Sequence, residues 1–176
     1  TMQRDRLIID NLLLIDENGM PEAPTIRQLI DKDVRELYTR DKSKDKSGYV
    51  KDCIVIYYLG DPKSPAKQSG LSDAEALKMA IEQAGLPSNY IPSALVLKII
   101  KRYYAQNIGK QIKYFQNILP DVPILFIGPS DMSENVQGKM QTRHFLVEMI
   151  NALRDTVINN GAAFWNTFEA MGGENS

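Results

Sequence analysis

Apolar residues recur at helical spacing over most of the first 118 residues. The segment 25–41 opens with Thr25 and Gln28, which have the spacing of a capping box. The apolar positions that share one helical face in this segment are Ile26, Leu29, Ile30, Val34, Leu37 and Tyr38. We therefore predict one amphipathic helix over residues 25–41, followed by a solvated segment of mixed charge at 41–48.

Two further helices are predicted downstream. Ser72 and Glu75 form a second capping box, and Gly85 supplies the C-terminal stop of that helix. Another apolar face begins near Ser93, and its helix either runs on or restarts after Gly109. The apolar positions of this last helix include Leu95, Val96, Ile99, Ile100, Tyr103 and Tyr104.

Two shorter segments are interpreted from β-branched residues and turn signals. Residues 6–22 hold two apolar runs on either side of Asn18-Gly19, a strong hairpin-turn signal, so a short hairpin or arm is predicted there. Residues 49–61 are rich in β-branched and aromatic residues but lie between predicted helices. Strand and buried helix therefore both remain open for this segment.

The pattern changes after Pro120. Residues 122–131 predict a short buried strand, residues 141–159 a long helix and residues 162–165 a second buried strand. Strand, helix and strand in this order are typical of a βαβ unit with parallel strands. Two strands and one helix cannot cover both faces of a parallel sheet. We therefore expect the rest of the chain or a partner to bury this surface, and an isolated 119–176 fragment to oligomerise or to dissolve poorly.

Together these elements predict a mixed, α+β fold class, with a mainly helical N-terminal part, a short hairpin and a partial βαβ C-terminal part. We divide the chain into a hairpin or arm (1–24), a helical module (25–108) and a partial α/β segment (109–176). Charge changes along the chain as well. Residues 119–176 carry three basic and seven acidic residues, whereas the remainder carries 18 basic and 15 acidic residues.

Composition narrows the possible chemistry. The formal net charge of −1 gives no overall attraction to nucleic acid or to an anionic membrane. No apolar run approaches about 18 residues, so no transmembrane helix is expected, and no secretory signal pattern is visible. Cys53 is the single cysteine, and its apolar neighbours favour a buried inert thiol over a nucleophile. His144 is the single histidine.

Serine chemistry has two candidate sets, and each has a simpler interpretation. Ser64 in the segment LGDPKS is either a displaced nucleophile or, as we prefer, part of an Asp-Pro turn. Ser130 and Asp131 could join His144 in a triad, but they are adjacent and point in different directions, so we interpret them as loop residues. We therefore assign no catalytic, cofactor-binding or metal-binding residue.

The basic stretch from Lys98 to Lys113 holds five basic residues, two tyrosines and no acidic residue. Basic residues interleaved with aromatic ones can hold single-stranded nucleic acid. A solvated helix face with core tyrosines is the preferred interpretation, and contact with an acidic protein subunit is a further one. Four aspartates were candidates for a calcium-binding loop, but they do not have the spacing of such a loop, and no cofactor is expected. They are Asp41, Asp45, Asp52 and Asp61.

The C-terminal part of the chain resembles the C-terminal part of SGNH/GDSL-type hydrolases. The similar segments are PILFIGPSDMS, the predicted helix after it, and GAAFWNTFEAMGGENS. The resemblance covers residues from about 110 to 176 and implies part of a flavodoxin-like α/β sandwich. Members of that family hydrolyse esters with a serine nucleophile, a histidine base held by an aspartate, and an oxyanion hole from glycine and asparagine. These blocks do not carry over: Gly60-Asp61-Pro62 lacks the serine, and the Asp-x-x-His block would lie beyond Ser176.

Residues 25–108 contain Arg-Asp-x-Ser-Lys-Asp-Lys, an aromatic-rich segment ending in Asp-Pro-x-Ser-Pro, and Ser-Asp-x-Glu-Ala. This text resembles a helical module in virion proteins of crAss-like and related Bacteroides phages. The resemblance implies a structural subunit near the neck or portal, without catalysis, located in the virion or the host cytoplasm.

Our leading interpretation is therefore a non-enzymatic phage structural or assembly protein. It would present amphipathic helix faces, chiefly those of residues 25–41 and 72–85, to copies of itself or to other virion subunits. The alternative is a truncated or chimeric SGNH/GDSL-type carbohydrate esterase, secreted or periplasmic, whose Ser and His blocks lie outside this chain. A binding module with an α/β remnant is a third interpretation, for which the sequence indicates no ligand.

Overall fold

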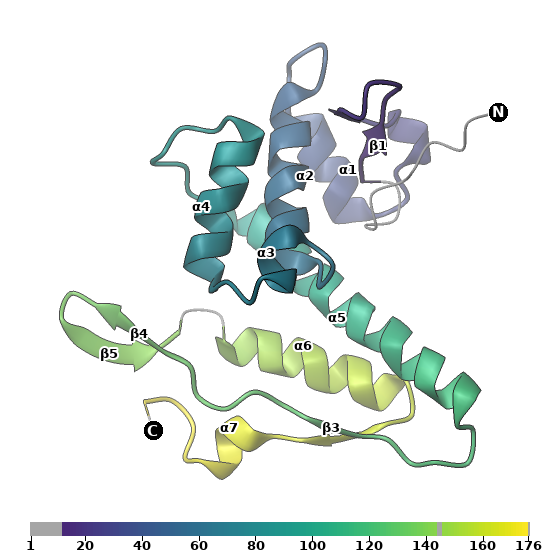
Figure 1. Cartoon of the computed structure of the whole chain (residues 1–176), viewed down its shortest axis with the longest axis vertical. Coiled ribbons are helices and arrows are strands. Elements are labelled where there is room, and N and C mark those ends of the chain that lie inside the picture. The colour runs from purple at the N-terminus through teal and green to yellow at the C-terminus, as the bar shows by residue number, and fades with distance from the viewer. Residues whose placement is uncertain (1–11, 144–145, 176) are drawn as a thin grey trace. The chain divides into compact units, whose positions relative to one another are not determined.

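The computed structural model describes residues 12–143 and 146–175 and has a mixed α and β fold (Figure 1). It divides into two compact units, Thr1–Tyr104 and Ala105–Ser176, named here the first and the second unit. Helices dominate the first unit, and the second combines strands with helices. The long helix α5 (Ala94–Ile118) contributes residues to both units.

A short hairpin opens the described chain. β1 (Leu14–Ile15) pairs antiparallel with β2 (Pro21–Glu22). The Asp16 carboxylate accepts hydrogen bonds from two backbone N–H groups of the turn, both at 2.8 Å, and Gly19 has a φ of 79°. The predicted hairpin turn is therefore confirmed, and residues 6–11 of the predicted hairpin lie outside the described residues.

The single helix predicted over residues 25–41 is wrong. The chain forms a 3-10 turn, η1 (Ile26–Gln28), and then a separate helix, α1 (Lys32–Arg40). Asp31 starts this helix, because its carboxylate accepts hydrogen bonds from the backbone N–H groups two and three residues later at 2.9 and 3.1 Å. As a result Ile30, on the predicted apolar face, is 90% exposed. The buried members of that face are Leu29, Val34 and Leu37.

The helix α2 (Ser47–Gly60) settles the ambiguity over residues 49–61 in favour of a helix. Its first turn is anchored by Asp41, whose carboxylate accepts hydrogen bonds from the backbone N–H groups of Tyr49 and Ser43, both at 2.8 Å. Burial alone would raise the pKa of Asp41. The hydrogen bonds from Ser43 and Tyr49 outweigh burial and hold that pKa below its ordinary value.

Gly48, in the first turn of α2, is a position where alanine should fail to stabilise the helix. Replacing a helical glycine with alanine ordinarily stabilises a protein by about 1 kcal/mol. A Cβ atom at Gly48 would lie 3.0 Å from Oδ2 of Asp41, so Gly48→Ala should displace that carboxylate and lose the gain. Urea denaturation measures the difference in the free energy of unfolding.

The matched control for this prediction removes the obstacle. In an Asp41→Ala background, the same Gly48→Ala change should recover its ordinary stabilising effect of about 1 kcal/mol. A clear gain in stability from Gly48→Ala in the unmodified chain would contradict the proposed clash.

The two later caps are confirmed. α4 (Asp73–Ala84) begins with reciprocal hydrogen bonds between Ser72 and Glu75, in which each side chain reaches the backbone N–H of the other residue. Gly85 ends this helix in the left-handed conformation, with a φ of 60°. The short α3 (Pro65–Gln68) precedes it.

The helix α5 is continuous over 25 residues, so the alternative of a restart after Gly109 is wrong. Gly109 allows a close approach within the second unit, because a Cβ atom there would lie 3.1 Å from Nδ2 of Asn160 and 3.2 Å from Cγ2 of Thr156. The Gln116 side chain also donates a hydrogen bond of 2.7 Å to the carbonyl oxygen of Asn160. The C-terminal half of α5 therefore packs against the end of α6 (Leu146–Asn159).

The core of the first unit is built around α2. Tyr49 and Cys53 of this helix are fully buried, together with apolar side chains from the hairpin region, α1 and α5. The hydroxyl of Tyr49 donates a hydrogen bond of 2.7 Å to the carbonyl oxygen of Leu12, and its ring meets that of Tyr38 edge to face. Other buried members include Leu13, Val34, Leu37, Val55, Ile56, Val96 and Ile99.

The second unit contains the predicted strand–helix–strand order. β3 (Leu125–Ile127) and β6 (Ala163–Trp165) pair in parallel, and α6 lies in the connection between them. Gly128 closes β3, and its backbone N–H donates a hydrogen bond of 2.9 Å to the carbonyl oxygen of Trp165. The short α7 (Thr167–Ala170) follows β6.

One element of this unit was not predicted. β4 (Ser133–Val136) and β5 (Lys139–Thr142) form an antiparallel hairpin, so the helix predicted from residue 141 begins instead at Leu146. The hairpin turn consists of Gln137 and Gly138, which have φ angles of 53° and 84°. Positive φ at both central residues is typical of a tight two-residue turn.

The parallel strands bury one face only, so the prediction of two buried strands is wrong for the other face. Phe126 and Phe164 stack with their ring centroids 6.0 Å apart, and Phe164 packs with α6 and α7. The opposite face carries three apolar side chains, each more than half exposed. They are Leu125, Ile127 and Trp165, and we name them the sheet face.

Candidate functional site

Ser64 is held in a structural role by its neighbours. Its side chain is fully buried, its hydroxyl donates a hydrogen bond of 3.0 Å to the carbonyl oxygen of Tyr58, and it accepts one from the backbone N–H of Lys67 at the start of α3. Asp61 stabilises the same turn by accepting a hydrogen bond of 2.8 Å from the backbone N–H of Lys63. This geometry supports the turn interpretation of LGDPKS, because the hydroxyl faces backbone groups in the interior.

The residues considered for a C-terminal triad are only partly placed. Ser130 and Asp131 follow β3 at the carboxyl end of the parallel strands, and the hydroxyl of Ser130 lies 3.5 Å from the carbonyl oxygen of Asp131. His144 lies outside the described residues. Two polar groups near the carboxyl ends of β3 and β6 are buried without a hydrogen-bond partner: both carboxylate oxygens of Asp131 and the hydroxyl of Thr167.

A pocket of about 690 Å³ opens in the second unit beside the β4–β5 hairpin. It is lined by β5, the first turn of α6 and the chain near Asn175. Charged side chains of both signs line the pocket. Lys139 and Arg143 are basic, and Glu148 and Glu174 are acidic. Neither Ser130 nor Asp131 lines this pocket, so the structure does not bring the predicted serine candidates to it.

Cys53 is buried in the core of the first unit, in agreement with the inert interpretation. Burial raises the pKa of its thiol, which keeps the thiol protonated at neutral pH. Burial also raises the pKa of Tyr90, and the hydroxyl of Tyr90 donates a hydrogen bond of 2.6 Å to Asp52. Desolvation raises the pKa of Asp52 as well. Cys53 is therefore part of the core, and Tyr90 and Asp52 are hydrogen-bonded to each other.

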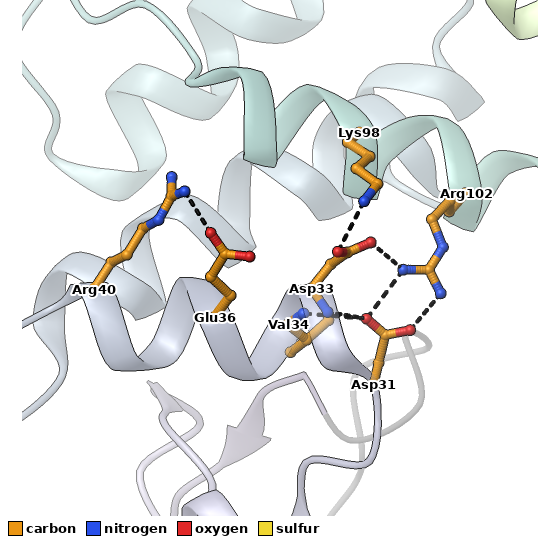
Figure 2. Close-up of polar contacts among 7 residues, drawn as sticks. All are labelled: Asp31, Asp33, Val34, Glu36, Arg40, Lys98 and Arg102. Carbon is orange, nitrogen blue, oxygen red and sulfur yellow. Dashed lines mark hydrogen bonds and ion pairs between the residues drawn. The ribbon is translucent and has the colours of Figure 1, made fainter.

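Two cations of the basic stretch are occupied in an ion-pair cluster at the start of α1 (Figure 2). Lys98 donates a hydrogen bond of 2.9 Å to Asp33, and Arg102 bridges the carboxylates of Asp31 and Asp33. The four charges cancel, and the cluster joins α5 to the N-terminus of α1. Lys98 and Arg102, two of the five basic residues of the stretch for which we preferred a solvated helix face over nucleic-acid binding, therefore make a contact inside the first unit.

The protonation of this cluster follows its contacts. Hydrogen bonding from Lys98 lowers the pKa of Asp33 and, with the bonds from Arg102, outweighs the opposite effect of burial. For Asp31 burial is the largest effect and would raise the pKa, but hydrogen bonds from Arg102 and from the N–H groups of α1 bring it below its ordinary value. Both carboxylates therefore stay ionised at neutral pH, as a structural ion pair requires.

Within residues 12–143 and 146–175, no group of three or more His, Cys, Asp or Glu side chains is placed to share a metal ion. Asp41, one of the four aspartates considered for a calcium loop, instead caps α2. In the described part of the chain, no helix has both the length and the apolar character needed to cross a membrane.

Most of the strongly exposed large hydrophobic side chains among the described residues lie in the second unit. Among the described residues, twelve of the sixteen strongly exposed large hydrophobic side chains belong to the second unit. Besides the sheet face, three of them share one side of α5 at positions 114, 115 and 118. These are Tyr114, Phe115 and Ile118, which we name the α5 flank. Sequence reasoning missed this flank, although its spacing of three and four residues was a readable signal.

The chain was compared with family models, curated proteins and solved structures. None of the three comparisons finds a match. The candidate surfaces therefore rest on the geometry and chemistry described above.

Proposed function

We propose that this protein works through protein–protein contacts, as a structural or assembly component of a phage particle. The observation that carries the proposal is the concentration of exposed apolar side chains on the second unit. Surfaces of this kind on a folded protein are typical of interaction sites. The resemblance of residues 25–108 to a virion module supplies the class of particle, with the virion or the host cytoplasm as location.

Particle fractionation tests this proposal. Phage particles purified by density gradient from a producing culture should contain the protein at a fixed ratio to the capsid subunits, and the intact mass of the particle-bound protein should be measured in the same sample. A free protein of similar abundance, such as a host enzyme, serves as the control for carry-over. Recovery of the protein only in the soluble cell fraction, with none in particles, would refute the assembly role.

A second candidate function rests on a different observation. The parallel β3–β6 pair, its α6 connection and the unpartnered carboxylate of Asp131 near the carboxyl ends of the strands fit part of an SGNH/GDSL-type esterase, whose remaining blocks would lie outside this chain. Hydrolysis of a small acetyl ester is the test. Turnover that is lost in His144→Ala would favour this function over the assembly role, and absence of turnover would show that this chain alone holds no working esterase site.

A further inference from the structure

The sheet face lacks the cover that parallel sheets normally have. α6 and α7 pack on the side of Phe164, whereas Leu125, Ile127 and Trp165 on the other side remain more than half exposed. Parallel strands in stable proteins are covered on both faces, most often by helices. The missing layer therefore fits an apolar helix side.

The α5 flank is an apolar helix side that lacks a partner of its own. Ile108 and Ile112 of the same helix are buried in the second unit, but Tyr114, Phe115 and Ile118 are more than half exposed. The rings of Tyr114 and Phe115 meet edge to face, with centroids 5.9 Å apart, and Ile118 lies one turn further along the helix. One chain thus offers both a sheet face without a helix and a helix side without a sheet.

The chain segments that contain the two surfaces carry opposite net charge. Residues 119–137 and 162–176, which include β3 and β6, carry five acidic residues and no basic residue. Residues 105–118, the part of α5 in the second unit, carry two lysines and no acidic residue. Opposite charge around apolar centres steers two surfaces together and fixes their orientation.

We propose that the α5 flank of one copy of this chain covers the sheet face of a second copy. This rests on the proposed function and deepens it, because it names the partner and the two surfaces that meet. The six apolar side chains would contribute roughly 600 Å² at about 100 Å² each, about half of a 1,200 Å² interface. That share matches the apolar fraction of ordinary interfaces, and the charged neighbours supply the rim.

The two surfaces differ from each other, so the contact joins unlike surfaces. A contact between unlike surfaces either repeats from copy to copy, giving a ring or a filament, or forms twice in a two-fold dimer. In both arrangements the same side chains of the α5 flank and the sheet face are in contact. Because the two surfaces differ, a variant that lacks one surface can still bind a variant that lacks the other. Two such variants could not bind each other if the contact joined like surfaces.

Two variants of the whole chain disable one surface each. The sheet variant carries Leu125→Glu, Ile127→Glu and Trp165→Phe, and the flank variant carries Phe115→Glu and Ile118→Glu. All five positions are solvent-exposed, so the changes remove no buried contact and both variants should stay folded. Far-UV circular dichroism checks that both variants are folded. A matched control carries Ile30→Glu and Ile91→Glu, which lie on exposed positions of the first unit.

Light scattering after size exclusion, over a series from about 1 to about 100 µM, is the first measurement. The unmodified chain and the Ile30/Ile91 control should associate with rising concentration, and each surface variant alone should remain monomeric. An equimolar mixture of the two variants should form a one-to-one complex. In that mixture Trp165 of the flank variant is the only tryptophan, and its fluorescence should shift to shorter wavelength as the α5 flank of the other variant covers it.

Three results would overturn the inference: a monomeric unmodified chain at all concentrations, association of either surface variant alone at the level of the unmodified chain, or a mixture that stays monomeric with unshifted fluorescence. If a charged variant fails to fold, a photo-reactive phenylalanine at position 115 of the otherwise unmodified chain replaces it. Mixed with isotope-labelled protein, it should crosslink to labelled peptides from β3 or β6, and crosslinks elsewhere would refute the contact. A chain that stays monomeric but is found in particles would leave the proposed function intact.

Discussion

Replacing Tyr49 with alanine is expected to lower the free energy of unfolding of the first unit by about 4 kcal/mol, within the range for large aromatic side chains removed from cores. Tyr49 is fully buried, and its ring centroid lies 5.1 Å from that of Tyr38. Its hydroxyl also donates a hydrogen bond to the carbonyl oxygen of Leu12. The substitution therefore leaves a cavity and a buried acceptor without its donor. Urea denaturation followed by far-UV circular dichroism gives the measurement.

Two companion variants separate the contributions. Tyr49→Phe keeps the ring and removes only the hydroxyl, so it should cost about 1 kcal/mol, the net value of one hydrogen bond. Ile30→Ala, at a position that is 90% exposed, should change stability by less than about 0.5 kcal/mol. A loss below about 1 kcal/mol for Tyr49→Ala would show that this side chain is not a core residue.

Removing the guanidinium of Arg102 should lower the free energy of unfolding by about 2 kcal/mol, between the values for exposed and buried ion pairs. Arg102 holds two carboxylates, and the side chain of Asp33 is only 10% exposed. Because the side chain of Arg102 is itself 40% exposed, solvent reduces the loss below that of a fully buried pair. Lys98→Ala should cost about 0.5 kcal/mol, because that side chain is 60% exposed and leaves Arg102 in place.

The cost of Arg102→Ala should depend on pH. The pKa values of Asp31 and Asp33 are lower in the folded protein than their ordinary value of 3.8. A carboxylate with a lowered pKa stabilises the fold above its unfolded pKa and loses that contribution as pH falls through the folded value. The difference between the unmodified chain and Arg102→Ala should therefore be complete at pH 5 to 7 and shrink below about pH 4. A difference that stays constant down to about pH 2 would contradict an ionic origin.

Local signals predicted much of the helical fold. The capping box at Ser72 and the stop at Gly85 define α4 as expected, since both act within a few residues of the chain. The capping box at Thr25 led to the wrong prediction that one helix starts there. The helix starts at Asp31 instead, because the Asp31 carboxylate accepts hydrogen bonds from two backbone N–H groups. Residues 49–61 could not be assigned from sequence, because a helix buried on several sides has no polar face to mark its period.

The second unit shows where sequence patterns were insufficient. The strand–helix–strand order was readable from apolar runs, but the β4–β5 hairpin was not, since its strands SENV and KMQT are polar and show no clear alternation. Exposure of one sheet face also escaped the pattern, because an apolar run looks the same whether one or both of its faces are covered. The ion pairs of Lys98 and Arg102 join residues more than 60 positions apart, which spacing rules do not reach.

The Asp41 carboxylate also bears on how the first unit folds. Its bond to the backbone N–H of Tyr49 spans only eight residues, and it brings α1 and α2 together across a short loop. Closing a loop of this length takes on the order of 10 to 100 ns, far less than forming contacts between distant segments. The link between the end of α1 and the start of α2 is therefore a local contact, which can close before the contacts of long sequence separation that join α5 to α1.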